Sequence, residues 1–150
     1  GIWAFNSRRQ SGRRPPPDDH MGTITTLGIL LLVLLLELKH SICDGPLQTL
    51  WMIGEKGTYG KTGGVVHAGL HAGGTLITFV VLGLPLGFSL LLSAVDGATH
   101  YHIDYFKEAL VRRKGWTPRD KFFWWTLAAD QTSHHVTYVA LAAVVAIWAN

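Results

Sequence analysis

The chain contains a single cysteine, Cys43, among its 150 residues. One thiol excludes a disulfide within the chain, and it also excludes cysteine-rich zinc ribbons and paired-cysteine redox motifs. We therefore expect Cys43 to be a small packing residue. Charged residues are also scarce, at 15% of the sequence, whereas hydrophobic residues make up 48%. The apolar residues fall in long blocks, and this pattern is typical of one helical membrane domain.

The first twenty residues differ in composition from the rest of the chain. They contain four arginines and three consecutive prolines, and they show neither a helical nor a strand period. We expect residues 1–20 to be a disordered, basic, proline-rich leader. Met21 offers a natural start, so the sequence leaves open whether the leader is native. The membrane domain is expected to cover residues 21–150.

Four apolar segments are long enough to cross a bilayer as helices. The first contains "ILLLVLLLEL" and stops before the helix breakers Gly45 and Pro46. A hydrophilic, glycine-rich loop follows at residues 54–64. Pro85 and its neighbouring glycines mark a turn between the second and third segments, and Pro118 suits the first turn of the fourth. The sequence predicts an all-α, four-helix transmembrane bundle with spans at about residues 24–44, 65–84, 86–113 and 118–148.

The basic residues indicate how these spans are oriented. Lys56 and Lys61 lie in the first loop, and the loop between the third and fourth spans contains five more basic residues. The turn at Pro85 contains none. Cytoplasmic loops carry the excess of Lys and Arg, so we place both basic loops in the cytoplasm. The protein is then a multi-pass membrane protein with both termini outside, although the arginines of the leader favour the opposite orientation.

Every expected span carries a pair of His or Asp residues four positions apart. This spacing places two side chains on one helical face, with Cβ atoms about 5–6 Å apart. Five such pairs occur after Met21, including Asp96 with His100, whereas random placement would give about one. One pair from each span is as follows: His40 with Asp44, His67 with His71, His100 with Asp104, and Asp130 with His134.

Antiparallel spans bring these four pairs toward the same membrane face, where they can form one polar layer. Helical bundles build dimetal sites in this way, from carboxylates and imidazoles on facing helices. We predict that one or two ions of zinc, iron or manganese bind there. The predicted ligands are His40, Asp44, His67, His71, His100, Asp104, Asp130 and His134. The alternative is hydrogen bonding between helices without function, but ionisable groups inside spans are costly and usually mark function.

Several neighbouring residues have weaker claims. Asp96 and Glu37 lie about one helical turn from predicted ligands and are candidates for further ligands, or for capping and snorkelling. His102 and His135 lie off the ligand faces, so we expect them to support the site or to pack.

Small residues and a glycine-rich loop complete the pattern. In "HAGLHAGG", Gly69 and Gly73, with Ala68 and Ala72, are expected to let the second span approach its neighbours closely. The loop "GEKGTYGKT" superficially suggests a phosphate-binding loop. It has Glu55 where that motif requires its first glycine, and no strand precedes it, so we exclude a nucleotide site.

The blocks "KHSICDGPLQTLWM", "HAGLH", "THYHIDYFK" and "ADQTSHH" resemble a known family. It comprises small bacterial and phage integral membrane proteins of the domain of unknown function 3307, and the resemblance covers about residues 25–145. The resemblance implies a multi-pass protein of the bacterial inner membrane. The pattern is more loosely similar to inner-membrane proteins described as metal-dependent hydrolases. Gly45 and Pro46 depart from the family pattern, which has an aromatic or apolar residue after Asp44. The resemblance implies that its polar positions are His40, Asp44, Gln48, His67, His71, His100, Asp104, Lys107, Asp130, Gln131 and His134.

Two classes of function follow from these residues. In the first, bound metal ions activate water for hydrolysis of a phosphoester or a lipid head group. An Asp that is not a ligand, or Asp130 itself, would take the proton. Lys107 would hold the substrate phosphate or simply anchor the helix at the membrane face. In the second, the protein binds or transports metal ions or protons without chemistry, and a carrier of this size would need to form a homo-oligomer. A structural membrane subunit is a further alternative. We expect membrane lipid as a partner and no nucleic acid, and the substrate stays open.

Overall fold

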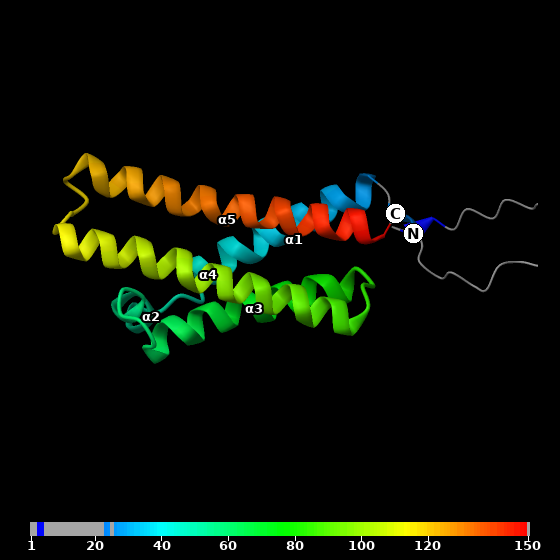
Figure 1. Cartoon of the computed structure of the whole chain (residues 1–150), viewed down its shortest axis with the longest axis horizontal. Coiled ribbons are helices and arrows are strands. Elements are labelled where there is room, and N and C mark those ends of the chain that lie inside the picture. Colours follow the sequence, from blue (N-terminus) through cyan, green and yellow to red (C-terminus); the bar gives the residue numbers. More distant parts are fainter. Residues whose placement is uncertain (1–2, 5–22, 25, 150) are drawn as a thin grey trace, which may run out of the picture.

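Four long helices run along the main axis of the computed structural model, which describes residues 3–4, 23–24 and 26–149 (Figure 1). Two short strands, β1 (Trp3–Ala4) and β2 (Thr23–Ile24), pair in antiparallel orientation. The rest of the predicted leader lies outside the described residues, so its disorder stays a prediction. From residue 26 onward the described chain consists of helices joined by short loops.

The long helices are α1 (Thr26–Asp44), α3 (Thr62–Val81), α4 (Leu86–Lys114) and α5 (Lys121–Trp148). Their bounds lie within about three residues of those expected. A short helix that the sequence did not predict, α2 (Leu50–Glu55), precedes the glycine-rich loop. The Thr49 hydroxyl caps α2 by accepting a hydrogen bond from the Met52 N–H.

The ends of α4 and α5 are fixed locally. Gly115 follows α4 with φ of 66° and donates its N–H to the Arg112 carbonyl, as in a helix C-terminus with a left-handed cap. In the loop that follows, the Thr117 N–H and hydroxyl both donate to the Asp120 carboxylate. These two hydrogen bonds, the backbone one first, hold the pKa of Asp120 below its usual value.

The helices pack so that the interior of the bundle is apolar toward one end and polar toward the other. Helix α3 contacts α1, α2 and α4, and α5 contacts α1 and α4. Figure 1 shows α2 and the α4–α5 loop at one end, and the α3–α4 turn and the C-terminus at the other. An apolar core that includes Leu32, Leu36, Phe79 and Val145 fills the half nearer the C-terminus. A layer of buried polar side chains lies between this core and α2.

The close contact between α3 and α4 is made by small residues. A Cβ on Gly97 would lie 2.9 Å from the Ala72 Cβ and 3.3 Å from the Ala68 carbonyl oxygen. The predicted close approach of helices at Ala68 and Ala72 is therefore confirmed. The prediction for Gly69 and Gly73 is wrong, because no atom of the described chain lies within 4 Å of a Cβ built on either one. Both glycines instead line a cavity beside α1.

Two of the described helices, α1 and α3, are long and apolar enough to cross a membrane. Helices α4 and α5 do not meet the same criterion of length and hydropathy, although the sequence predicts membrane spans there. The reason is that polar side chains such as His100, Asp104, Asp130 and His134 occupy the middle turns of these two helices. The four-helix arrangement is observed, and the crossing of the membrane by α4 and α5 stays a prediction.

Candidate metal centre

Helices α1, α3, α4 and α5 bring all eight predicted ligands into one cluster. The ligand atoms form three groups, and within each group they lie within 4.8 Å of one another. We name each group by one member. The Asp44 group is Asp44, His67, His71 and His100; the His40 group is His40, His100 and His134; and the Asp104 group is Asp104, Asp130 and His134.

In the Asp44 group, three imidazoles face one carboxylate oxygen. Asp44 Oδ1 lies 3.0 Å from His67 Nε2, 3.2 Å from His71 Nε2 and 4.0 Å from His100 Nε2. His67 Nε2 and His100 Nε2 are 3.1 Å apart. The three histidines are at most 1% exposed. This is a compact, nitrogen-rich set of donors whose imidazoles are buried and whose carboxylate is 21% exposed.

The Asp104 carboxylate lies between two groups. Its Oδ1 is 3.5 Å from His134 Nε2, whereas its Oδ2 is 3.3 Å from both His67 Nε2 and His100 Nε2. Asp130 Oδ1 is 3.7 Å from His134 Nε2 on the other side. One oxygen of Asp104 thus faces the Asp104 group and the other faces the histidines of the Asp44 group.

Several of these buried atoms lack a hydrogen-bond partner within the described part of the chain. They include Asp130 Oδ1 and His134 Nε2, which both belong to the Asp104 group, whereas Asp104 Oδ2 is paired with the Lys56 ammonium. A buried polar atom left unsatisfied costs about 1–3 kcal/mol. A cation bound between these two atoms would satisfy both of them at once. The donor set therefore fits a divalent metal ion.

His40 is held at the edge of the cluster by other polar groups. Its Nδ1 lies 2.8 Å from the Tyr138 hydroxyl, and its Nε2 lies 3.2 Å from both Gln131 Oε1 and Asp44 Oδ2. The His40 group shares His100 with the Asp44 group and His134 with the Asp104 group. His40 is therefore better placed to orient other ligands than to add an independent ion.

A buried ion pair that the sequence analysis did not predict adjoins the cluster. Lys39 Nζ lies 2.9 Å from Asp96 Oδ2 and 3.5 Å from His71 Nδ1, and the two charged side chains are 6% and 1% exposed. The Thr75 hydroxyl also donates to Asp96. Asp96, a candidate ninth ligand, thus neutralises Lys39 and belongs to none of the three groups. The sequence feature that could have predicted this ion pair is a lysine inside an apolar helix, where a cation needs a partner.

Glu37 and the remaining histidines of the described residues, His102 and His135, lie outside the cluster. His135 Nδ1 lies 2.6 Å from Glu37 Oε2 on a partly exposed surface. His102 Nδ1 donates to the Ala98 carbonyl at 2.7 Å. None of these three residues belongs to a ligand group of the described chain.

A polar cavity of about 230 Å³ adjoins the carboxylates of the cluster and is bordered by α2. Lys56, the residue after α2, is 7% exposed and points its Nζ to within 2.7 Å of Asp104 Oδ2. Lys107 Nζ lies 2.7 Å from Glu108 Oε1 in the same lining. The full lining of this polar cavity is Asp44, Gln48, Ile53, Lys56, Asp104, Lys107, Glu108, Leu127, Asp130 and Gln131.

Arg112 holds α2 against this cavity. Its Nη2 donates to the carbonyl oxygens of Ile53 and Gly54 at 3.2 and 2.9 Å. These carbonyls lie at the C-terminal end of α2, where a cation is favourable. The Lys56 side chain follows directly, so its position depends on this anchor.

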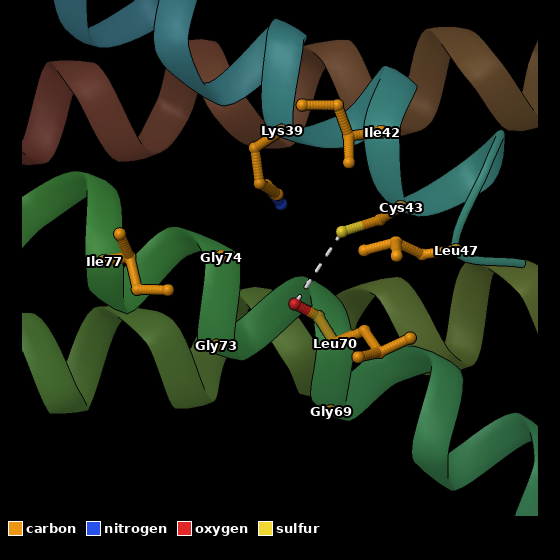
Figure 2. A pocket seen from close by; sticks show the side chains of 9 residues that line it. All are labelled: Lys39, Ile42, Cys43, Leu47, Gly69, Leu70, Gly73, Gly74 and Ile77. Atoms are coloured by element: carbon orange, nitrogen blue, oxygen red, sulfur yellow. Dashed lines mark hydrogen bonds between the residues drawn. The ribbon is translucent and has the colours of Figure 1, made fainter.

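A second cavity, of about 420 Å³, lies between α1 and α3 and has a mostly apolar lining. Figure 2 shows Lys39 and Cys43 of α1 facing the glycines of α3, with the Cys43 thiol directed at the Leu70 carbonyl. Cys43 is a buried free thiol, consistent with a packing residue. Lys39 is the one charged residue of this lining and is neutralised by Asp96.

Comparison with known proteins supports the resemblance seen in the sequence. Residues 30–150 match the family model DUF3307, described as a protein of unknown function. This range contains every residue of the three ligand groups. Neither a curated protein nor a solved structure matches the chain. The looser similarity to metal-dependent hydrolases therefore stays a prediction.

Proposed function

We propose that this chain, which belongs to the DUF3307 family of proteins of unknown function, is a membrane protein that binds two transition-metal ions. The observation that carries this proposal is the convergence of eight His and Asp residues from four helices, two of whose buried ligand atoms are unsatisfied. Hydrogen bonding alone does not account for the cluster, because it leaves Asp130 Oδ1 and His134 Nε2 without a partner in the described chain.

Two ions fit the geometry better than one. The Asp44 group and the Asp104 group have no residue in common, so each can hold its own ion. Asp104 would then bridge them, since its two oxygens face different groups. Two-metal sites hold their ions about 3.5–4 Å apart and often serve hydrolysis. The three histidines of the Asp44 group suit zinc or iron, and the two carboxylates of the Asp104 group suit manganese or iron.

The surface of the bundle supports placement in a membrane. Large exposed apolar side chains lie on all four long helices, and extended apolar surface marks contact with a membrane or a partner. Examples are Leu30 and Leu34 on α1, Ile77 and Val81 on α3, Leu90 and Leu91 on α4, and Val136 and Val139 on α5. We assign all four helices to the bacterial inner membrane, with the basic α2 end in the cytoplasm.

The chemistry that we propose is hydrolysis of a phosphoester, free or in a lipid head group. A divalent ion held by the cluster would supply Lewis-acid chemistry, since such an ion lowers the pKa of water to about 7 and polarises phosphoryl groups. Asp130 lines the polar cavity and would accept the proton of the attacking water. Lys107 lines the same cavity and would hold the substrate phosphate.

One observation favours the alternative function, binding or transport of metal ions or protons. Lys39 lies 3.5 Å from His71, and it links the cluster to Asp96 deeper in the bundle. Chains of ionisable groups within spans can serve as proton or ion paths. Turnover of a phosphoester panel by the metal-loaded protein would favour the enzyme, and metal binding without turnover would favour the carrier.

Titration with Co²⁺ tests the proposed binding function. Detergent-purified protein stripped of metal should develop the visible absorption bands of cobalt bound by histidine, and these bands should saturate at two ions per chain. Replacing both His67 and His71 with alanine should remove one of the two ions. The matched control is His135→Ala, which changes a histidine outside the ligand groups and should leave the titration unchanged. Absence of cobalt bands from the wild type would reject the proposal.

A further inference from the structure

Lys56 is a buried cation whose counter-charge is a proposed metal ligand. Its side chain is 7% exposed, and its Nζ lies 2.7 Å from Asp104 Oδ2. The same oxygen lies 3.3 Å from two imidazole nitrogens of the cluster. If Asp104 binds metal ions through both oxygens, its negative charge is shared with them, and Lys56 then faces a cationic centre. A buried ammonium group is stable only when it is paired.

The net charge of the polar cavity's lining changes sign when metal binds. Four carboxylates and two ammonium groups line it, so without metal its lining is net negative and repels anions. Two divalent ions would make the same lining net positive, because the histidine ligands are neutral. The net positive cavity then requires a compensating anion. That anion would lie between the Lys56 ammonium and the metal ions.

The amides of the lining can also contribute hydrogen bonds. Gln48 Nε2 donates to Asp44 Oδ1, and Gln131 Nε2 donates to Asp130 Oδ2, both at 3.1 Å. Each amide nitrogen carries two protons, so each has a second donor for a ligand in the cavity. A volume of about 230 Å³ accommodates a tetrahedral oxyanion and a few further atoms. It is smaller than typical pockets that enclose a whole organic ligand.

We propose that the polar cavity binds a phosphate group between the metal ions and the Lys56 ammonium, and that Lys56 selects anionic substrates. This inference rests on the proposed metal-binding function, since the anion is bound only when metal is present. The phosphate can belong to a soluble phosphoester or to a lipid head group, with the rest of the molecule outside the cavity. Lys56 is thus a substrate-binding residue in addition to Lys107.

Isothermal titration of the metal-loaded, full-length protein with inorganic phosphate tests this assignment. The wild type should bind phosphate when metal is present and should lose that binding after chelation. Lys56→Gln should raise the Kd about tenfold or more, because a hydrogen bond to a charged group is lost. Lys56→Arg keeps the charge and should retain most of the affinity. Lys61→Gln, a change of an exposed lysine in the same loop, is the matched control and should leave the Kd unchanged.

Metal content, measured on every sample, separates the two proposals. Wild-type protein that holds no metal overturns the proposed function and this inference with it. Protein that holds metal but binds no phosphate, or binds it equally well as Lys56→Gln, overturns this inference alone. Titration with dihexanoyl phosphatidic acid and with glycerol phosphate identifies the source, since the tighter ligand shows whether a lipid or a soluble ester is preferred.

Discussion

Individual side chains in the polar layer depend on partners from other helices. Lys39 on α1 is neutralised by Asp96 on α4, with additional contacts from Thr75 on α3 and Tyr138 on α5. One ion pair thus joins all four long helices just beside the proposed ligands. Its removal should therefore affect the stability of the bundle as well as the position of His71, which lies 3.5 Å from Lys39.

Replacing Lys39 with methionine should destabilise the protein by about 3–5 kcal/mol, because the Asp96 carboxylate would remain buried without its cation. Thermal unfolding in detergent measures the effect. The double variant Lys39→Met with Asp96→Asn removes both charges and should recover much of the loss. A Lys39→Met protein as stable as the wild type would show that this ion pair does not support the fold.

Spacing in the sequence is enough to predict which histidines and aspartates converge, but not their individual partners. Pairs four residues apart fix a helical face, so His67 with His71 and Asp130 with His134 could be placed together in advance. Spacing does not reveal Lys56, because it reaches the cluster from a loop whose path depends on tertiary contacts. It also does not show that Asp96 faces Lys39, since that depends on the rotation of α4 against α1.

At the scale of secondary-structure elements, α2 is the one helix of the described chain that the sequence did not predict. Its six residues, "LWMIGE", are too few to show a helical period, and they follow Pro46 closely. Its position depends on Arg112, which binds the carbonyls of Ile53 and Gly54 from α4. The long helices were predictable because glycine or proline bounds each long, largely apolar segment on at least one side.

Replacing Arg112 with alanine should release α2 from α4 and leave the long helices in place. Amide hydrogen exchange should then become faster in residues 50–56, because the carbonyls at the end of α2 lose their donor. Arg113→Ala is the matched control, since it removes an exposed neighbouring cation. If exchange in α2 is the same in both variants, the Arg112 contacts do not hold the helix.

Replacing Gly97 with alanine should separate α3 from α4. The new methyl group would lie 2.9 Å from the Ala72 Cβ, and overpacking of this kind costs about 1–3 kcal/mol. Gly87→Ala is the control on the same helix, because no atom of the described chain lies within 4 Å of its Cβ. That change should be neutral or stabilising, since alanine favours helix by about 1 kcal/mol. Equal unfolding temperatures for the two variants would disprove a close helix contact at Gly97.

At the scale of the whole molecule, the bundle places an apolar core and a polar layer one after the other along its axis. The core includes Leu36 and Phe79, and the polar layer begins one turn farther toward α2, at Lys39 and His40. Long apolar blocks made the four-helix bundle predictable. The same blocks predicted four spans, but hydropathy alone supports only α1 and α3, because the ligands themselves reduce the apolar character of α4 and α5.

Elemental analysis of the full-length protein, purified in detergent without chelators, measures whether the polar layer holds metal. We expect two transition-metal ions per chain, retained through gel filtration and lost when Asp104 is replaced with asparagine. Wild-type protein without any transition metal under these conditions would show that the polar layer is not a metal site.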